Sequence, residues 1–543
     1  MIGIVHGYGL AGAGSNLWTR ETVAALCDNG ETVHLMCQET DPERFDFIAE
    51  AWTHTDDEAD RVFSREVPYP GRCILHRPAL NVLPTYVRPD RESDYVRSIL
   101  DLDMDALEEY LRRNVVALRR VSDDTGIRAW HVNHTILLSE ALRRLREETG
   151  IAYAVMPHGS SLEYIVRHDE RMRPIARRAL ESADAIFALN QEVRDRLADF
   201  FPDLDLEPRT VTVRVGVDTQ RFRPVPRPER PASVERLAAA LEGVPRGRGP
   251  AHAAALREAV DPELDHDGFR SALEPALDYA TDRPDADLED RLRTLDLPRA
   301  RILTFVGRII PAKGVPAIVV ALPRIVERHP QTRLLLVGAG WLREYLEAFV
   351  LALSRGDGEL AARIIEWTTR REQEGARPSG AAFIRRLRDT GEYDAYVDAA
   401  RRCLTPEHVL FTGFLEHPLL AHVFPLADVA VFPSAVAEAS PLVVPEAAAC
   451  GCLPMGTDFA GMHHSLASLA PRLPDSVARL MPLDPDPERT APDIVRNVDE
   501  ALRSDADITE ALRRAAVEEY DWHGIARTLV QQLGGLQQAA AAW

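Results

Sequence analysis

The sequence predicts an α/β protein built from two doubly wound domains, each with a parallel sheet. Short β-rich apolar runs alternate with stretches of helical periodicity along most of the chain. The alternation fades after residues 218–231, which are rich in proline and arginine, and restarts at residue 301. A chain of 543 residues with 45% hydrophobic content is long enough to bury two separate cores.

The first domain is predicted over residues 1–224. A strand within residues 2–7 leads through a glycine turn into a helix that begins near Ser15. The further predicted strands are residues 32–37, 128–134, 153–159, 185–190 and 211–216. Each has a stretch of helical periodicity beside it, which is typical of βαβ units.

The second domain is predicted over residues 299–515, with residues 516–543 as a closing helix that packs back toward the first domain. Its predicted strands are residues 301–307, 332–340, 408–413, 428–434 and 452–457. Two segments lack the alternation and are predicted as helical insertions: residues 225–298 and, inside the second domain, residues 350–405. A flexible charged linker is the alternative for both.

Composition disfavours several classes of partner. The formal net charge of -21 repels nucleic acid and anionic membrane surfaces. No apolar run reaches the length of a membrane span, and the N-terminus lacks the pattern of a signal peptide. The six cysteines include no CxxC pair, and Cys450 and Cys452 are interpreted as small packing residues rather than a redox or metal site. We therefore expect a reduced, cytoplasmic protein.

Lys313 is the single lysine among 64 basic residues, and it lies between a predicted strand and helix. Parallel sheets bind ligands beyond the carboxyl ends of their strands, where helix N-termini favour anions. Arg308 and Lys313 flank this turn, so two cations are predicted beside a helix N-terminus. Such a pair suits a diphosphate, whereas two solvated surface charges are the alternative.

Glu438 and Glu446 lie eight residues apart after the predicted strand at 428–434, with Glu446 inside a short apolar helix. Eight helical residues span roughly 12 Å, about the distance from the sugar to the ribose of a nucleotide sugar. The helix N-terminus near Ser440, Leu442 and Val443 offers free backbone N–H groups to phosphate oxygens. A helix-start charge and a surface glutamate are the alternative.

The histidines divide into one candidate and several structural residues. His158, in the sequence PHG, lies between a predicted strand and helix and is a candidate site residue. His131 and His134 are interpreted as following a strand, and His463 and His464 adjoin the expected phosphate region. Both pairs are interpreted as structural or acceptor-lining residues rather than metal ligands.

Taken together, these motifs resemble those of the family 4 retaining glycosyltransferases. The similar segments are FVGRIIPAKG (305–314), EASPLVVPEAAACGCLP (438–454, an E-x7-E motif), the glycine loop and first helix at 12–37, MPHGSSLEYIV (156–166), RVGVDTQRFRP (214–224) and the closing helix at 518–533. The resemblance covers most of the chain except the two insertions.

The resemblance implies the GT-B fold, two Rossmann-like domains facing a cleft, and metal-independent sugar transfer from a nucleoside diphosphate donor with retention of configuration. It implies no cofactor beyond this co-substrate. The catalytic residues it implies are His158, near the anomeric centre on the acceptor side, Glu438, Lys313 and Arg308. The donor-binding residues it implies are Gly12, Gly14, Arg308, Lys313, Leu415 in the base-bordering segment 411–417, Glu438, Ser440, Leu442, Val443 and, at the ribose, Glu446.

Three positions depart from the family pattern. Val215 stands where an asparagine is usual, Pro441 stands where a glycine is usual, and residues 460–462 read AGM instead of a glycine pair. Pro441 lacks an N–H group, so it removes one donor from the expected phosphate site. These departures concern phosphate contacts and leave the predicted fold unchanged.

The sequence leaves the donor open among UDP-, GDP- and ADP-linked sugars, and it leaves the acceptor unnamed. Three alternatives to a transferase remain: a nucleotide-sugar epimerase, a disaccharide phosphorylase, and a non-catalytic sugar-nucleotide-binding scaffold. The combination of the E-x7-E motif with Arg308 and Lys313 favours the transferase. The helical insertions are expected to govern acceptor choice, domain closure or self-association as a homo-oligomer.

Overall fold

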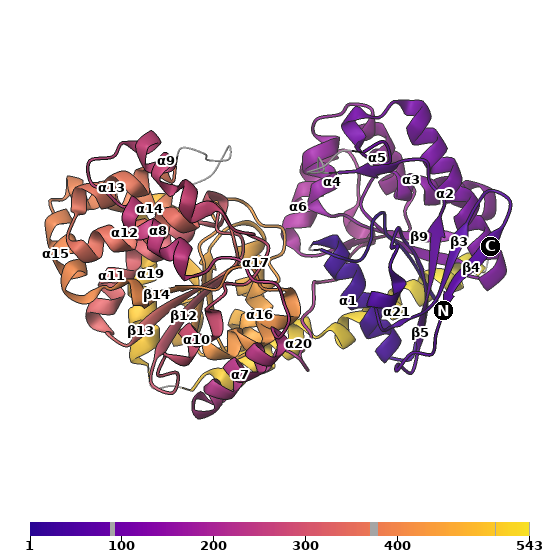
Figure 1. Ribbon diagram of the computed structural model, residues 1–543. Helices are drawn as coiled ribbons and strands as arrows, with labels where there is room; N and C mark the ends of the chain where they lie inside the picture. The colour runs from indigo at the N-terminus through magenta and orange to yellow at the C-terminus, as the bar shows by residue number, and fades with distance from the viewer. Residues whose placement is uncertain (13, 87–92, 370–377, 505–506, 542–543) are drawn as a thin grey trace. The chain divides into compact units, whose positions relative to one another are not determined.

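The protein divides into two compact units in a computed structural model that describes residues 1–12, 14–86, 93–369, 378–504 and 507–541. Unit 1 comprises Met1–Asp218 and Tyr520–Trp543, and unit 2 comprises Thr219–Glu519 (Figure 1). The chain thus leaves unit 1 within the segment rich in proline and arginine and returns to it for its last helix. Each unit contains its own parallel sheet, which confirms the predicted fold class.

Unit 1 is built on a nine-stranded sheet with the order β11-β10-β9-β8-β1-β2-β5-β3-β4. Its strands are β1 (Ile2–Val5), β2 (Thr32–Met36), β3 (Ile48–His54), β4 (Ala59–Ser64), β5 (Arg72–Pro78), β8 (Ala129–Asn133), β9 (Ala152–Met156), β10 (Ala185–Ala188) and β11 (Thr210–Thr212). All neighbours are parallel except β3 and β4. A separate pair is formed by β6 (Leu83–Thr85) and β7 (Val96–Ser98).

The helices of unit 1 follow the βα rhythm of the sequence. They are α1 (Ser15–Asp28), α2 (Met104–Thr125), α3 (Leu138–Thr149), α4 (Gly159–Ser161), α5 (Met172–Ser182), α6 (Gln191–Phe200) and α21 (Trp522–Ala541). The last helix packs against α1, β8 and β9. Trp522 is buried where α21 begins, and the Cβ of any residue replacing Gly216 would overlap its ring. Gly216 therefore lets the chain pass close to this helix.

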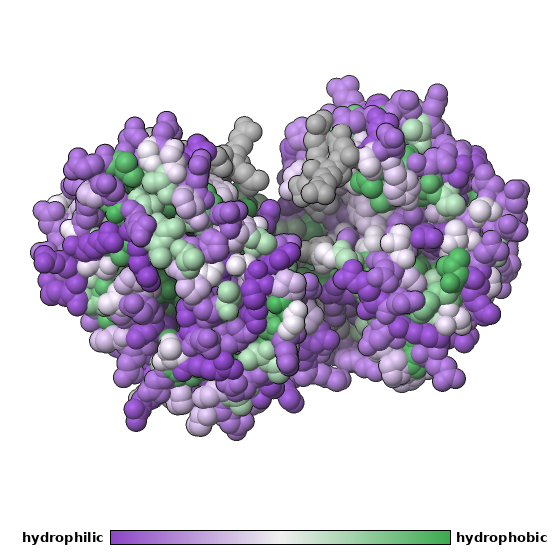
Figure 2. Space-filling view, viewed as in Figure 1, coloured by the Kyte–Doolittle hydropathy of each residue, from purple (hydrophilic) through white to green (hydrophobic). Residues whose placement is uncertain are grey.

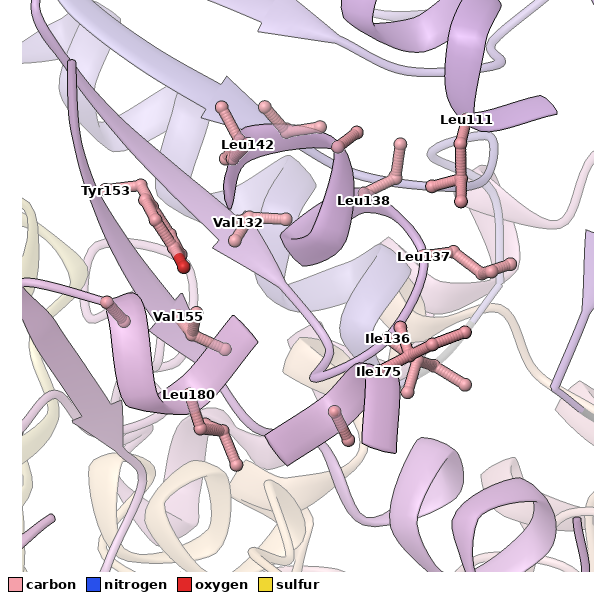
Figure 3. Packing of buried hydrophobic residues seen from close by; sticks show 14 of the residues in the cluster. Leu111, Val132, Ile136, Leu137, Leu138, Leu142, Tyr153, Val155, Ile175 and Leu180 are labelled. Atoms are coloured by element: carbon pink, nitrogen blue, oxygen red, sulfur yellow. The ribbon is translucent and has the colours of Figure 1, made fainter. Parts of the chain in front are cut away.

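The core of unit 1 lies between its central strands and the helices α2, α3 and α5. The labelled residues in Figure 3 come from these elements and the loop before α3. All five residues of β8 and of β9 are buried, which fits strands covered on both faces. The hydroxyl of Tyr153 donates to the carbonyl of Ala179 over 2.6 Å, so the ring is buried with its polar atom satisfied.

Unit 2 is built on a six-stranded parallel sheet with the order β14-β13-β12-β15-β16-β17. Its strands are β12 (Arg301–Val306), β13 (Thr332–Val337), β14 (Val409–Phe411), β15 (Val429–Phe432), β16 (Leu453–Thr457) and β17 (Pro482–Leu483). Numbered within the unit, this is the order 3-2-1-4-5-6 of a Rossmann sheet. The direction of winding reverses between β12 and β15, so the ligand position expected for this fold lies at the carboxyl ends of these two strands.

The segments that precede and connect the strands of this sheet are mostly helical. They are α7 (Arg230–Ala240), α8 (Pro250–Ala259), α9 (His266–Leu277), α10 (Leu288–Arg293), α11 (Val315–Arg328), α12 (Arg343–Arg355), α13 (Gly358–Trp367), α14 (Ser379–Asp389), α15 (Tyr393–Cys403), α16 (Val443–Ala449), α17 (Ala460–Leu469), α18 (Asp475–Ala478), α19 (Pro487–Arg503) and α20 (Thr509–Tyr520). Helix α11 is apolar on nearly all sides and packs against α14, α15 and α19. A helix of this composition is stable only when it is enclosed.

The two segments predicted as insertions are helical and packed. Residues 225–298 contain α7 to α10, and residues 350–405 contain the end of α12 followed by α13 to α15, with residues 370–377 outside the described residues. Arg343 makes two hydrogen bonds to Asp285, at 2.7 and 2.6 Å, and both side chains are 2% exposed. This paired geometry fastens the first insertion to α12.

No helix within the described ranges is both long and apolar enough to cross a membrane. Figure 2 shows polar residues over most of the visible face, with apolar residues scattered among them in small groups. Scattered apolar residues are normal on protein surfaces.

Candidate active site

The turn after β12 carries Lys313 at the winding reversal of unit 2. Gly307 ends the strand, a short 3-10 helix covers Pro311–Lys313, and α11 begins at Val315. Lys313 therefore lies just before the helix rather than in its first turn. The loop after β15 reaches the same end of the sheet and carries Glu438.

Lys313 and Glu438 form an ion pair across these two loops. The Nζ atom of Lys313 lies 2.5 Å from Oε1 of Glu438, and the side chains are 27% and 20% exposed. The hydroxyl of Ser434 donates to the same carboxylate oxygen over 2.9 Å. The cation and the carboxylate are thus held together, partly shielded from water, at the position where the fold predicts a ligand.

Backbone contacts fix the two loops to each other. The N–H of Ala435 donates to the carbonyl of Ala312 over 2.9 Å and joins the two loops. The N–H of Gly461, in α17, supports the Glu438 loop from the other side of the chain by donating to the carbonyl of Glu438 over 2.7 Å. A Cβ at Gly461 would lie 2.0 Å from the carbonyl oxygen of Ala439, so only glycine fits there. The sequence AGM at 460–462 thus keeps the one glycine that supports the Glu438 loop.

Gly314 sets the approach of the Lys313 turn to the β15 loop, and its replacement provides a test. Its φ is +67°, and an added Cβ would lie 1.7 Å from the carbonyl oxygen of Pro433. We expect Gly314→Ala to lower the free energy of unfolding by about 1 kcal/mol for the positive φ and by about 1–3 kcal/mol more for the overlap. Urea unfolding of the whole chain measures this loss.

Gly391→Ala is the matched control for this substitution. Gly391 has a φ of +71° in the same unit, but nothing lies within 4 Å of the position of its Cβ. Gly391→Ala should therefore lower the free energy of unfolding only by the cost of the positive φ, because its Cβ overlaps no other atom. Equal losses in the two variants would contradict the close contact between the Lys313 turn and the β15 loop.

Glu446 lies within α16, whereas Glu438 lies in the loop before it. The helix begins at Val443, so the estimate of eight helical residues between the two glutamates was wrong. The segment before Val443 is not helical because Pro441 and the contacts of the Glu438 loop hold it in another conformation. Glu446 is 2% exposed, and its Oε1 lies 2.6 Å from Nε2 of His417.

The other predicted donor residues of unit 2 lie around these loops. Arg308 is exposed and forms no ion pair with any residue that the structure describes. Leu415 is 6% exposed, so its side chain is turned into the protein. Ser440, Leu442 and Val443 are partly exposed where α16 begins.

Unit 1 has its own winding reversal between β1 and β8. The loop after β1 contains Gly12 and Gly14, with φ of +104° and +65°, and Gly14 precedes α1. The side chain of Asn16 ties this loop to the sheet: Nδ2 donates to the carbonyl of Ala11 over 2.7 Å, and Oδ1 accepts from Nε2 of His6 at 3.1 Å.

His158 follows β9 at the same end of the sheet, where Asn133 holds it. The Nε2–H group of His158 donates to Oδ1 of Asn133 over 2.9 Å. Asn133 is fully buried, and its Nδ2 donates to Oγ1 of Thr19 over 2.9 Å and to Nδ1 of His6 at 3.3 Å. The ring of His134 lies 4.8 Å from that of His158. The structure thus connects the glycine loop to His158 through Asn16, His6 and Asn133.

This network determines the chemical state of His158. The hydrogen bond to Asn133 places the ring proton on Nε2 and leaves the lone pair on Nδ1. Burial lowers the pKa of His158 to about 3, with the neighbouring His6 and His131 acting in the same direction. The imidazole is therefore neutral near pH 7 and can accept a hydrogen bond, but it cannot act as a cationic acid.

The remaining histidines have structural partners. His131 lies inside β8 and is fully buried, so its predicted position after the strand was wrong. His134 follows the strand as predicted, and Oγ of Ser15 lies 3.2 Å from its Nε2. His463 lies 2.6 Å from Oδ1 of Asp458. Among the described residues, no group of three or more His, Cys, Asp or Glu side chains has an arrangement that could hold a metal ion.

Sequence reasoning did not single out Asn133, His417 or Ser434, although His417 ends the predicted base-bordering segment 411–417. Asn133 lies between two histidines at the end of a buried strand, and a polar residue at such a position is the only indication that the sequence offers. His417 and Ser434 are close to the predicted site residues in space but lie in loops without a periodic pattern. Their partners became apparent only in the folded chain.

Two units with Rossmann-like sheets, each with polar side chains at its winding reversal, define a GT-B-type protein, and comparisons with known proteins agree. The model of the family described as glycosyl transferases group 1 matches residues 389–470, which include Glu438 and Glu446. None of the curated proteins matches the chain. The match confirms the predicted resemblance at the segment that carries the E-x7-E motif.

Solved structures share the fold at low sequence identity. Sucrose-phosphate synthase from Thermosynechococcus elongatus is 18% identical, with 99% of each chain covered and a TM-score of 0.53. Anabaena HepE in complex with UDP is 11% identical, with 98% of this chain and 100% of that chain covered and a TM-score of 0.51. A structure described as trehalose-6-phosphate from E. coli bound with UDP-2-fluoro glucose is 13% identical, with 98% of each chain covered and a TM-score of 0.50. The chain therefore has the GT-B fold, and its residues 389–470 match the group 1 model.

Proposed function

We propose that the protein is a retaining glycosyltransferase that moves a sugar from a nucleoside diphosphate donor to an acceptor. The observation that carries this proposal is the Lys313–Glu438 pair at the winding reversal of unit 2. A diphosphate needs cations at this position, and a sugar needs hydrogen-bond acceptors beside them. The pair supplies both from two loops that backbone contacts hold together.

In this proposal Lys313 and Arg308 bind the diphosphate, and Lys313 stabilises the negative charge that grows on it as it departs. The exposed guanidinium of Arg308 is available for phosphate oxygens. Lys313 exchanges part of its contact with Glu438 for a phosphate oxygen, which leaves the carboxylate to accept hydrogen bonds from sugar hydroxyls. A compact ammonium between two anions needs little rearrangement to make this exchange.

Glu446 and His417 are assigned to the ribose, with segment 411–417 beside the base. Glu446 is nearly buried, so a hydroxyl that reaches it displaces little water and meets a carboxylate already oriented by His417. His158 of unit 1 is assigned to the sugar side, where its neutral Nδ1 accepts a hydrogen bond from a hydroxyl. Sugar transfer with this set of residues uses no metal ligand.

The first nucleotide to test is UDP. Anabaena HepE is described in complex with UDP, and the E. coli structure is described with UDP-2-fluoro glucose. Thermal unfolding of the whole chain with UDP, GDP or ADP separates the bases, because a ligand at 100 times its Kd stabilises the folded state by about 2.7 kcal/mol. A rise with UDP alone supports a UDP-linked donor, and no rise with any of the three contradicts nucleotide binding by unit 2.

Glu438 and Glu446 are expected to affect catalysis differently. The ribose hydroxyls change little during transfer, so Glu446→Gln should raise the donor KM with a smaller effect on kcat. Glu438 lies beside the reacting sugar in the proposal, so Glu438→Gln should lower kcat more than it weakens donor binding. Steady-state kinetics with one cognate donor measure both effects.

Glu359→Gln serves as the control for these two substitutions. Glu359 is an exposed residue of α13 that pairs with Arg388 over 2.9 Å, so the change removes one surface charge of unit 2. We expect wild-type kcat and KM for this variant. The opposite pattern, with Glu446 controlling kcat and Glu438 only KM, would reverse the assignment of sugar and ribose to the two glutamates.

A further inference from the structure

A cavity of unit 2 lies at the edge of its sheet, where the first insertion packs against the strands. Its volume is about 470 Å³, and it is lined by residues of α8, α10, α12 and the edge strand β14 with the turn before it. Lys313 and Glu438 do not line this cavity, and its lining includes Pro406 and Glu407, at the amino end of β14. The cavity is therefore distinct from the proposed donor site.

The cavity has an apolar wall. Leu256 of α8, Leu295 after α10, Val350 of α12 and Leu410 of β14 contribute to its lining. A space of this size with an apolar wall is typical of small-molecule sites, which add a few polar groups to fix the orientation of the ligand. The polar groups of this cavity therefore decide which ligand it accepts.

Most of the carboxylates of the cavity are already neutralised by arginines. Asp285 accepts hydrogen bonds from both Arg343 and Arg291, at 2.6–2.7 Å. Asp287 lies 3.0 Å from Nε of Arg291. Glu347 accepts from Arg248 over 2.7 Å and from Arg343 over 3.0 Å. These carboxylates already have arginine partners, so they do not favour binding of an added cation.

Two arginines of the lining have no such partner. Arg257 and Arg333 form no ion pair with any residue in the described part of the chain, and Arg333 donates only to the backbone carbonyls of Pro330 and Thr332. Burial lowers the pKa of Arg333, and Glu407 opposes this effect. The hydrogen bond to Thr405 is the main cause that lowers the pKa of Glu407, and His408 and Arg257 act in the same direction. Arg257, Arg333 and Glu407 all line the cavity, so two guanidinium groups share one nearby carboxylate there.

A buried donor in the lining is also unsatisfied. Arg248 is 4% exposed, and its Nε–H group has no hydrogen-bond partner among the described residues. Oε1 of Glu344 lies 3.8 Å from this atom, which is too far for a hydrogen bond. An unpaired buried N–H group is costly, and a ligand with an acceptor oxygen removes part of this cost.

The cavity shares its wall with the segment that leads to the proposed donor site. The N–H of Asp285 donates to the carbonyl of Thr412 over 2.8 Å, and the N–H of Phe414 donates to the carbonyl of Arg283 over 3.0 Å. Arg291 also donates to the carbonyl of Phe411 over 3.0 Å. A ligand that packs against Phe411 and Asp285 therefore restrains residues 411–414 from one side.

We propose that this cavity binds an amphiphilic monoanion, a small molecule with an apolar body and one carboxylate or phosphate group, and that its binding orders residues 411–414. The apolar body lies against the leucines and Val350, and the anionic group lies near Arg257 and Arg333. The binding does not depend on the proposed glycosyl transfer. Its value as a regulatory site rests on that function, because residues 411–417 are assigned to the nucleotide base.

The test uses three probes of one shape: naphthalene-2-carboxylate, the neutral naphthalene-2-carboxamide and the cationic 2-naphthylmethylammonium. Isothermal titration calorimetry on the whole chain should give at least tenfold tighter binding for the carboxylate than for the other two. The double variant Arg257→Gln/Arg333→Gln should lose at least tenfold in carboxylate affinity. Arg299→Gln, an exposed arginine outside the cavity, should lose nothing. Equal affinity for the three probes, or no binding, would overturn the proposal.

A filled cavity tests the position of the probe independently of charge. Ala253 of α8 lines the cavity, whereas its neighbour Ala254 is exposed and does not. Ala253→Trp should abolish carboxylate binding, and Ala254→Trp should preserve it. Unchanged binding in a folded Ala253→Trp variant would place the probe elsewhere and overturn the site.

Hydrogen exchange tests the ordering of the shared wall without any nucleotide. Saturating naphthalene-2-carboxylate should slow amide exchange in residues 409–414 at least threefold and leave β8 and β9 of unit 1 unchanged. Unchanged exchange in residues 409–414 with a bound probe would overturn the coupling to the base segment.

Discussion

Lys313→Arg is expected to lower kcat about 100- to 1000-fold, although the positive charge is retained. Removal of one stabiliser of developing charge typically costs this much. The ammonium lies 2.5 Å from Glu438 within a turn that Gly314 and Ala312 hold against the β15 loop. A planar guanidinium is longer and needs more room, so it displaces either Glu438 or the diphosphate.

Two further measurements separate the loss of the ammonium from a loss of folding. Lys313→Met keeps a similar volume without charge, and its kcat defines the activity that remains without a cation at this position. The thermal unfolding midpoint of each variant shows whether the unit 2 fold is retained. A kcat for Lys313→Arg within threefold of wild type would contradict the specific role proposed for the ammonium.

Acid is expected to destabilise unit 1 through its buried histidines. Burial is the main cause that lowers the pKa of seven of them, to about 4 for His6, His34, His54 and His131, to about 3 for His158, and well below the usual 6.5 for His76 and His134. Because the unfolded chain binds these protons near pH 6.5 and the folded chain does not, stability is fully present above about pH 6.5. It falls as the pH drops toward 4, by about 1.4 kcal/mol per pH unit for each histidine that titrates only when unfolded.

Three of these histidines form a hydrogen-bonded row across neighbouring strands. Nδ1 of His34 on β2 lies 3.0 Å from Nε2 of His76 on β5, and Nδ1 of His76 lies 2.9 Å from Nε2 of His54 on β3. Each contact requires one ring nitrogen without a proton, so binding of a second extra proton to the row breaks at least one hydrogen bond. The row therefore adds to the acid sensitivity of the β2–β5–β3 part of the sheet.

Amide exchange followed by mass spectrometry at pH 7.0 and pH 5.0 measures this effect, after correction for the intrinsic pH dependence of exchange. Peptides from β2, β5, β8 and β9 should lose several kcal/mol of protection at pH 5.0. Peptides from β12 and β13 of unit 2 are the internal control and should lose less. Equal changes in the two units would contradict the contribution of the buried histidines.

The sequence predicted the sheet and the ligand position where local pattern and topology agree. The apolar runs of β12, after its first residue, and of β15 are buried, and the rules of parallel sheets place Lys313 and Glu438 at the carboxyl ends of these strands. The strands β3, β4 and β5 were not predicted. Strand β4 has mostly exposed or half-exposed residues and pairs antiparallel at the sheet edge, so it lacks the apolar run on which the prediction depended.

Contacts between side chains that are far apart in the sequence could not be predicted from local sequence patterns. Asn133 meets His6 across 127 residues, and Lys313 meets Glu438 across 125, so no local spacing indicates either contact. The backbone pairing of Arg283 and Asp285 with residues 412–414 is likewise a contact between distant parts of the sequence. These residues have no apolar alternation of their own and pair only because the first insertion folds back onto the sheet edge.

Release of nucleoside diphosphate from UDP-, GDP- and ADP-glucose by the whole chain tests the proposed transfer most directly. Hydrolysis of a donor in the absence of acceptor reports cleavage of the bond between sugar and phosphate without knowledge of the acceptor. We expect wild-type protein to release the diphosphate from one of the three donors, with the α-anomer of the sugar formed first, and Lys313→Arg to do so at least 100-fold more slowly. Contradiction would come from equal release by the wild-type protein and Lys313→Arg, or from a wild-type protein that neither binds nor cleaves any nucleotide sugar.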